Sequence, residues 1–285
     1  MKFLNKITAI IVTYKSSNVL FELLKILDPI CNIIIVENSN DSLFKNKIEK
    51  NFNNVKCILA NKNIGYGRAA NIGILNSKTE YLLLINPDAK TNYNSIKNLY
   101  SFILKHNNAM LAPMNYTFKK KLWHRFGYSD NRKIIDNNNL LFDVDYVSGH
   151  MVLISKNIFK KIGLFDKNIF LNFEDRDLCM RLKKKNYKIF VLKNAKVEHL
   201  EGESSFSETE ALKKLKWHFG WSMYYFYKKH FGYLFAIKIT APYLFKNIVK
   251  LILSCLFFKK KSGIAYLFQI KGLLYSYFGS KSFYR

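Results

Sequence analysis

Glu174, Asp175 and Asp177 place three carboxylates within four residues, the densest group of reactive side chains in the chain. They follow the apolar Phe173 and open a segment whose apolar residues have helical spacing. A helix dipole favours acidic residues in a first turn, which accounts for part of the cluster. Adjacent carboxylates beside an apolar ring could also raise the pKa of one of them and provide a general base. We therefore take Glu174 and Asp175 as candidate catalytic residues.

A further carboxylate, Asp88, follows the apolar run of residues 81–85 in the sequence Asn86-Pro87-Asp88. Open α/β sheets bind ligands at the carboxyl ends of their strands, so this residue would lie at a ligand-binding edge. Hard cations take oxygen ligands from one or two carboxylates and from substrate phosphates, so Asp88 could hold Mg²⁺ or Mn²⁺ against a diphosphate. Asn-Pro-Asp is also a common turn, and a turn without a metal is the alternative at this position.

Residues 61–71 combine glycines, amides and a guanidinium, which suits a phosphate-binding segment. They include the pattern G-x-G-x-x-A, from Gly65 to Ala70, a near match to the dinucleotide-binding fingerprint. That fingerprint follows a first strand and has an acid at the end of the second strand, whereas this pattern follows the third apolar run. A nicotinamide-dependent enzyme is therefore disfavoured.

The N-terminal part of the chain alternates short β-branched runs with longer segments of helical spacing. Such alternation is typical of βαβ units around a mostly parallel sheet, so we predict an α/β fold. The runs lie at residues 7–12, 33–36, 55–59 and 81–85. An irregular polar stretch at 116–145 is followed by another apolar run at 144–154, and we expect mixed strands and active-site loops there. Helices are expected at 158–162 and from about 174 onward.

The composition, 49% hydrophobic and 23% charged over 285 residues, excludes a disordered chain, a collagen-like chain and a small disulfide scaffold. The formal net charge of +26 favours an anionic partner: nucleic acid, phospholipid or phosphorylated small molecules. The four cysteines are far apart without metal-site spacing, which predicts a reduced, intracellular chain. The basic opening leads into a short apolar run without a small-residue cleavage site, so we expect a first strand and not a signal peptide.

The composition changes at about residue 211, since residues 211–285 contain fourteen Lys or Arg and no Asp or Glu. We predict a domain at 1–210 and a basic, aromatic, mainly helical region at 211–285. Lysines interrupt its apolar runs, none of which approaches the roughly 18 to 20 residues of a spanning helix. Lys238, Lys246 and Lys250 fall within an arc of roughly 120° of a helix, which predicts an amphipathic helix in an anionic membrane interface. A helix packed on the protein with its lysines in water is the alternative.

Seven short motifs occur in order between residues 7 and 205. They are Ile11-Val12-Thr13-Tyr14, Val36-Glu37-Asn38-Ser39, Asn63-Ile64-Gly65-Tyr66-Gly67 with Asn71, Asn86-Pro87-Asp88, Gly149 with Met151, Phe173-Glu174-Asp175-Arg176-Asp177-Leu178-Cys179 with Arg181, and His199-Leu200-Glu201-Gly202-Glu203-Ser204. In this order they resemble the motifs of the family 2 nucleotide-sugar glycosyltransferases, most closely the bacterial rhamnosyltransferase-like branch. Any one motif is weak, whereas the ordered set is fairly specific.

The resemblance implies a GT-A fold, in which a Rossmann-like βαβ half binds the nucleotide and a mixed-sheet half receives the acceptor. It assigns the divalent metal, Mg²⁺ or Mn²⁺, to Asp88, and implies that His199 reaches the metal or the diphosphate, a structural role being the alternative. It makes Asp175, beside Glu174, the general base. The residues it assigns to the nucleotide sugar are Thr13, Tyr14, Glu37, Asn63, Gly65, Arg68, Asn71 and Asn86.

A protein of this kind would be an inverting transferase that moves a sugar, such as rhamnose or another deoxysugar, from a nucleoside diphosphate to a saccharide acceptor. The expected acceptor is lipid-linked, in bacterial cell-surface polysaccharide synthesis, for example of the O-antigen of lipopolysaccharide. The enzyme would be cytoplasmic and peripheral on the inner face of the cytoplasmic membrane. Two other classes stay open: a basic nucleic-acid-binding protein, disfavoured because the chain has no nucleic-acid motif, and a catalytically silent scaffold of a polysaccharide assembly complex.

Overall fold

The computed structural model describes residues 6–15, 17–116, 133–134, 141–199 and 208–282. Contacts divide the chain into two compact units. The first, here the sheet unit, comprises residues 1–64, 68–165 and 178–204. The second, here the helical unit, comprises residues 65–67, 166–177 and 205–285. The predicted domain boundary between residues 210 and 211 stays a prediction.

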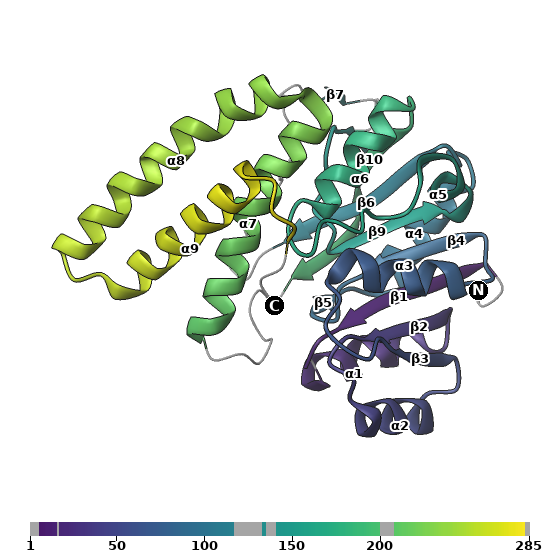
Figure 1. The fold of residues 1–285 in the computed structure, drawn as a ribbon. Coiled ribbons are helices and arrows are strands. Elements are labelled where there is room, and N and C mark those ends of the chain that lie inside the picture. Colours follow the sequence, from purple (N-terminus) through teal and green to yellow (C-terminus); the bar gives the residue numbers. More distant parts are fainter. Residues whose placement is uncertain (1–5, 16, 117–132, 135–140, 200–207, 283–285) are drawn as a thin grey trace. The chain divides into compact units, whose positions relative to one another are not determined.

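Ten strands form one mixed sheet in the described part of the sheet unit (Figure 1). Their order is β3-β2-β1-β4-β9-β6-β10-β8-β7, and β5 pairs with β10. Strands β3, β2, β1 and β4 are parallel, and β9 then runs antiparallel to both β4 and β6. The strands are β1 (Ile7–Thr13), β2 (Asn32–Glu37), β3 (Val55–Leu59), β4 (Tyr81–Ile85), β5 (Ala89–Lys90), β6 (Ala109–Tyr116), β7 (Lys133–Ile134), β8 (Leu141–Asp143), β9 (Met151–Ser155) and β10 (Lys188–His199).

The four parallel strands confirm the predicted apolar runs, and the burial of β1, β2 and β4 explains why those three runs do not alternate with polar residues. Every residue of β1 and β4 is buried, because helices cover both faces of a parallel sheet. β-Branched side chains fit such a doubly covered strand well. The helices of this part of the chain are α1 (Ser17–Leu27), α2 (Ser42–Asn51), α3 (Tyr66–Asn76), α4 (Tyr93–Ile103), α5 (Lys156–Ile162) and α6 (Glu174–Lys184).

Capping residues define two of these helix ends. The Asp41 carboxylate accepts a hydrogen bond from the Phe44 backbone N–H at the start of α2. Gly163, with φ of 82°, ends α5, as the sequence predicts. In the apolar run at 144–154, where we expect mixed strands and loops, Met151–Ser155 forms strand β9 and the residues before it form a loop. Val144, Tyr146 and Val147 are buried just outside β8, and the Val144 N–H donates to the Ile189 carbonyl of β10 at 2.9 Å.

The helical unit contains three long helices, α7 (Glu208–Phe231), α8 (Tyr233–Leu256) and α9 (Lys260–Tyr277), coloured green to yellow in Figure 1. Helices α7 and α9 touch through glycines. A Cβ atom on Gly272 would lie 1.9 Å from the Trp217 carbonyl oxygen, and one on Gly220 would lie 2.2 Å from that of Gln269. No larger residue fits at either position without separating the two helices, so both glycines serve close helix packing.

Helix α8 differs from what the lysine spacing suggests. An 18-residue stretch of this 24-residue helix has at most two charged residues and is apolar enough, by length and composition, to cross a membrane. Only 17% of that stretch is buried inside the structure. The expectation that no segment approaches this length therefore needs correction for α8, whose apolar surface is largely open.

Candidate functional site

The carboxyl ends of β1 and β2 lie side by side in the sheet unit. The register pairs Thr13 with Glu37, and the Thr13 carbonyl accepts a 2.8 Å hydrogen bond from the Asn38 backbone N–H. The Thr13 hydroxyl is buried and has no hydrogen-bond partner among the described residues. A buried hydroxyl without a partner is costly, so it suits a position that meets a polar group of a ligand. Tyr14, the next residue, is half-buried.

Glu37 is 1% exposed, and its carboxylate binds the turn that follows β2. It accepts hydrogen bonds from the backbone N–H groups of Ser39 (3.0 Å) and Asp41 (2.8 Å), and from the Ser39 hydroxyl (2.5 Å). These bonds hold the backbone at the strand end in a fixed shape. Its predicted contact with the nucleoside stays a prediction.

Asn38 connects two of the predicted site segments. Its side-chain N–H₂ donates to the Asn63 side-chain oxygen at 3.1 Å, and its own side-chain oxygen accepts from the Ile64 backbone N–H at 2.9 Å. The structure therefore brings Asn63 to the end of β2, beside Glu37. Asn38 belongs to one of the seven ordered motifs but is not among the predicted site residues. Its position beside an acid at a strand end was the available signal.

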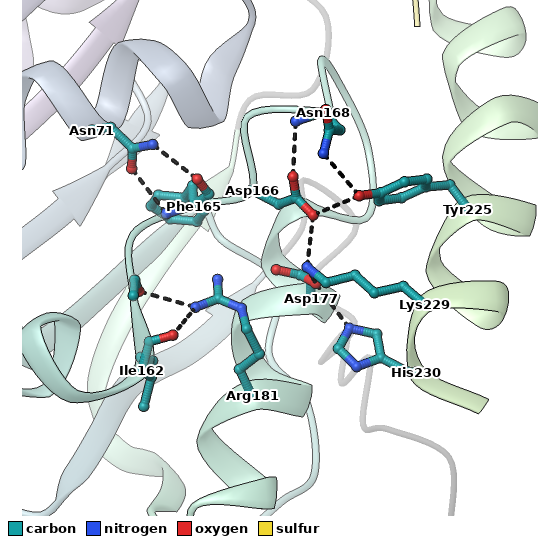
Figure 2. A network of polar contacts seen from close by, with 11 residues as sticks. Asn71, Ile162, Phe165, Asp166, Asn168, Asp177, Arg181, Tyr225, Lys229 and His230 are labelled. Atoms are coloured by element: carbon teal, nitrogen blue, oxygen red, sulfur yellow. Dashed lines mark hydrogen bonds and ion pairs between the residues drawn. The ribbon is translucent and has the colours of Figure 1, made fainter. Parts of the chain in front are cut away.

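Asn71 and Arg68 both lie on α3 but differ in exposure. The Asn71 amide forms two 2.9 Å hydrogen bonds with the Phe165 backbone, donating to its carbonyl and accepting from its N–H (Figure 2). This pairing anchors the chain at Phe165, whereas Arg68 is exposed. The predicted donor contacts of both residues stay predictions.

Asp88 is half-buried in the tight turn between β4 and β5. The turn is closed by a 3.2 Å hydrogen bond from the Ala89 N–H to the Asn86 carbonyl, and the Asn86 N–H donates to the His150 carbonyl at 2.8 Å. The antiparallel register of β5 and β10 places the backbone of His199 opposite Ala89, the residue after Asp88. The two candidate metal ligands, Asp88 and His199, are therefore close along the backbone: His199 lies opposite the residue that follows Asp88.

This pairing fits a divalent cation that is also held by a substrate. Within the residues that the structure describes, no group of three or more His, Cys, Asp or Glu side chains could hold a metal alone. Mg²⁺ and Mn²⁺ bound with a nucleotide need only one or two protein ligands, because the phosphates supply the others. One half-buried carboxylate, that of Asp88, is therefore enough protein for an ion that is shared with phosphates.

Glu174 and Asp175 open α6 in the helical unit. Burial, and then the neighbouring charge of Asp175, raises the pKa of Glu174 from 4.5 to about 8. Its Oε2 atom is buried without a hydrogen-bond partner among the described residues. The Asp175 carboxylate accepts a 2.7 Å hydrogen bond from the Arg176 backbone N–H. At neutral pH the buried Glu174 carboxyl therefore favours its protonated form.

Tyr66 and Gly65 belong to the same unit as these acids. Burial raises the pKa of Tyr66, and the charges of Glu174 and Asp175 raise it further. The Tyr66 N–H donates to the Phe170 carbonyl at 3.1 Å, and Gly65 has φ of 87° with only 2.4 Å between an added Cβ and the Phe170 carbonyl oxygen. Gly65 therefore has a packing reason to be glycine. Its predicted contact with the donor stays a prediction.

Residues 8–163, more than half of the chain, match the sequence model of Glycosyl transferase family 2. The chain belongs to this family. The match covers the Rossmann-like strands, the glycine-containing segment and Asp88. It confirms the resemblance found in the ordered motifs.

Two named proteins are similar to this family 2 chain over most of its length. The low-salt glycan biosynthesis hexosyltransferase Agl10 of Haloferax volcanii is 24% identical over 206 residues, which are 65% of this chain and 64% of the relative. The dTDP-rhamnosyl transferase RfbF of Shigella flexneri is 25% identical over 215 residues, 70% of this chain and 71% of the relative. The chain spans just under two thirds of the haloarchaeal relative's length.

Solved structures show the same fold at low identity. GalNAc-T7, crystallised with UDP, GalNAc and Mn²⁺, superposes with a TM-score of 0.59 at 16% identity, over 79% of this chain and 50% of that chain. Residues 1–349 of Staphylococcus aureus TarS superpose with a TM-score of 0.54 at 15% identity, over 98% and 93%. These similarities, with the mixed sheet, confirm the predicted GT-A fold.

Proposed function

We propose that this family 2 chain is a metal-dependent, inverting glycosyltransferase that uses a nucleoside diphosphate sugar and a saccharide acceptor. The observation that carries the proposal is the register that sets His199 beside the Asp88 turn at the edge of the sheet. Rhamnose or another deoxysugar on dTDP is the proposed donor, supported by the name of the Shigella relative. A lipid-linked acceptor in cell-surface polysaccharide synthesis, such as that of an O-antigen, follows from the resemblance.

The donor would bind along the strand ends of the sheet unit. The unpartnered Thr13 hydroxyl and the Asn38–Asn63 pair offer polar groups where a nucleoside is expected. The exposed Arg68 guanidinium suits a phosphate because it presents several N–H donors in a plane. The full set proposed for the nucleotide sugar is Thr13, Tyr14, Glu37, Asn63, Gly65, Arg68, Asn71 and Asn86.

Asp88 would hold the cation through oxygen and His199 through nitrogen, with the diphosphate completing the set. When bound, such an ion offsets the negative charge that develops on the leaving diphosphate. Mg²⁺ and Mn²⁺ both suit a carboxylate and phosphate environment.

Asp175 would act as the general base. The acceptor oxygen forms a bond to the anomeric carbon while the bond from that carbon to the diphosphate breaks, and the hydroxyl proton passes to Asp175. A single displacement of this kind inverts the anomeric centre. Burial raises the pKa of the neighbouring Glu174 to about 8, so that carboxyl would stay protonated near pH 7 beside the proposed base.

A thermal-shift panel tests the proposal, because a ligand that binds the folded state raises its apparent stability. The panel contains nucleoside diphosphates and dTDP-rhamnose, each with Mn²⁺, Mg²⁺ or EDTA. We expect stabilisation by one nucleoside diphosphate only with metal, lost in Asp88→Ala and kept in Asp175→Asn. Metal-independent binding, or loss of binding in Asp175→Asn with retention in Asp88→Ala, would overturn the assignment of roles.

We propose further that the helical unit binds the anionic inner leaflet of the cytoplasmic membrane, through α8. This helix buries small or polar residues, namely Ala236, Thr240, Asn247 and Ser254. Its large apolar residues face outward instead, and Phe258 just beyond it is 93% exposed. Small and polar contacts between helices with apolar residues outside are typical of packing in lipid. The outward residues are Leu234, Phe235, Ile239, Phe245, Ile248, Val249, Ile252, Leu253, Leu256, Phe257 and Phe258.

The charge of this region supports the choice of an anionic surface. Residues 211–285 carry fourteen Lys or Arg and no acid, and Lys259, Lys260 and Lys261 lie next to the apolar surface and are exposed. Basic residues beside an inserted apolar face add roughly 1 kcal/mol each near anionic lipid. A nucleic acid would leave the outward leucines and phenylalanines without a complementary surface.

Flotation with phosphatidylglycerol vesicles tests this membrane proposal on the full chain. The double variant Leu256→Ser/Phe258→Ser should bind at least about tenfold more weakly, since each large apolar side chain contributes roughly 1.5 to 3 kcal/mol when fully buried. Leu43→Ser, which changes a leucine 80% exposed on α2, is the matched control and should bind like the unchanged protein. Equal binding by the double variant and the control would overturn the proposal.

A further inference from the structure

The segment from Asp166 to Asp177 carries the proposed base and contains a strained turn. Asn172 and Phe173 have φ of 64° and 67°, a left-handed conformation that residues other than glycine seldom adopt. Each such residue costs roughly 1 to 3 kcal/mol and persists only where its surroundings hold it. The Phe173 carbonyl accepts the Asp177 N–H at 2.8 Å, so this turn leads directly into α6 and the carboxylate of Asp175.

Helix α7 of the same helical unit holds that turn. The Ser222 hydroxyl donates to the Leu171 carbonyl at 2.9 Å, and the Asn172 amide donates to the Leu215 carbonyl at 3.2 Å. Aromatic rings add packing on either side of these bonds. The ring pairs, with their centroid distances, are Phe170–His218 (4.5 Å), Phe173–Phe219 (5.4 Å) and Phe173–Phe226 (5.6 Å).

Lys229 binds both ends of the segment at once (Figure 2). Its ammonium lies 2.7 Å from Asp166 Oδ2 and 2.5 Å from Asp177 Oδ1. His230 Nε2 lies 2.8 Å from the same Asp177 oxygen, whose side chain is 0% exposed. The Tyr225 hydroxyl donates to Asp166 at 2.9 Å.

The electrostatics agree with this geometry. Burial alone would raise the pKa of Asp166, yet hydrogen bonds from Lys229, the Asn168 backbone and Tyr225 lower it below its usual value. Asp166 is therefore held as an anion against the Lys229 ammonium, which also contacts Asp177. A buried carboxylate that loses such a partner is strongly destabilised, so the two ends of the segment depend on Lys229.

We infer that Lys229 is a positioning residue for Asp175, and that α7 holds the segment 166–177 in the shape that catalysis requires. The inference rests on the proposed role of Asp175 as the base. Asp175 lies two residues before Asp177 in the first turn of α6, so a shift of the helix start moves its carboxylate. A displacement of about 1 Å can cost about 10²-fold in rate, whereas the donor contacts assigned to the strand ends are unchanged.

The variant Lys229→Met removes the ammonium and keeps most of the side-chain volume. Lys228→Met is the matched control, because Lys228 is the adjacent exposed lysine on the same helix. Lys229→Arg retains the charge and should restore most of the function. The probes are hydrogen exchange of residues 166–177, Mn²⁺-dependent binding of dTDP, and hydrolysis of dTDP-rhamnose, in which water takes the place of the acceptor.

For Lys229→Met we expect exchange in residues 166–177 to quicken at least about tenfold and the turnover number for hydrolysis to fall about 10²-fold. The dissociation constant of dTDP and the KM for dTDP-rhamnose should stay within about twofold, because most of the proposed donor residues, including Thr13, Glu37 and Asn63, lie outside residues 166–177 and their contacts. Lys228→Met should match the unchanged protein in every measurement. A merely structural role would instead lower stability without separating turnover from KM.

Unchanged exchange in Lys229→Met, or an equal loss in Lys228→Met, would overturn the inference. If Lys229→Met does not fold, the same measurements are made on Tyr225→Phe and Lys229→Arg. Tyr225→Phe removes one hydrogen-bond donor to Asp166, so the same changes are expected with smaller size. If the unchanged protein neither binds dTDP nor hydrolyses dTDP-rhamnose, the proposed donor fails. Exchange of residues 166–177 in the variants then decides the role of α7 independently.

Discussion

Replacing Glu174 by glutamine should change how the stability of the protein depends on pH. The folded carboxyl has a pKa of about 8, raised from 4.5 by burial and by Asp175. Between these two values the folded protein holds a proton that the unfolded chain has released. Stability contributed by this group is therefore fully present below 4.5 and is lost as the pH rises through about 8.

The size of the effect follows from one proton. Where the unfolded chain binds about one proton fewer, the free energy of unfolding falls by about 1.4 kcal/mol per pH unit. From about pH 5.5 to about pH 7.5 the unchanged protein should therefore lose roughly 2 to 3 kcal/mol more than Glu174→Gln does. Comparing slopes removes the cost of placing an amide in the buried site, since that cost does not vary with pH.

Urea unfolding of both proteins at several pH values across this range measures the difference. Glu22→Gln, which removes a carboxylate whose side chain is 72% exposed, is the matched control and should follow the unchanged protein. Parallel plots of unfolding free energy against pH for the unchanged protein and Glu174→Gln would refute the argument. Parallel plots would mean that Glu174 is ionised in the folded state and could itself share the role of base.

Three further outcomes follow from the geometry. Asp88→Ala should abolish the Mn²⁺-dependent part of dTDP binding and leave any metal-independent part, as titration calorimetry with and without EDTA would show. Gly65→Ala should lower the free energy of unfolding by about 2 kcal/mol or more in urea titrations, because its Cβ meets the Phe170 carbonyl at 2.4 Å and φ is 87°. Vesicle binding should weaken as salt rises and weaken less steeply in Lys260→Gln, measured by flotation at a series of salt concentrations.

The parallel half of the sheet could be predicted, because fully apolar runs joined by helical segments are compatible with few arrangements other than parallel strands. Runs such as Ile33–Val36 are too apolar for a half-exposed strand, and the helical spacing between them indicates crossovers. The mixed half was less accessible. Strand β10 contacts β6, β8 and β5, and the residues that choose among such partners are far apart in the sequence.

The candidate site divides in the same way. Asp88 and Asp175 stand at predictable positions, a strand end and a helix start. The partners of Asp177 could not be predicted, because Lys229 and His230 come from a helix more than 50 residues later in the chain. The helix dipole explained the acid at a first turn but gave no reason for complete burial of its side chain.

Because α7 contacts residues 166–177, a truncation is a poor test of what the C-terminal helices do. Helix α7 supplies hydrogen bonds, ion pairs and ring contacts to residues 166–177. Cutting the chain near residue 210 would remove those partners together with the apolar surface of α8. Point changes on the outward face of α8 separate the two effects, which a truncation would confuse.

The four cysteines, finally, give the protein a natural labelling position. Cys31, Cys57 and Cys179 are buried, and burial raises the pKa of the Cys31 and Cys57 thiols to about 12. Cys255 is exposed near the end of α8, between the outward-facing Leu253 and Leu256. Because the thiolate is the reactive form, a maleimide fluorophore should attach there first without any mutation. A polarity-sensitive dye at this thiol would then report directly whether the end of α8 meets water or lipid.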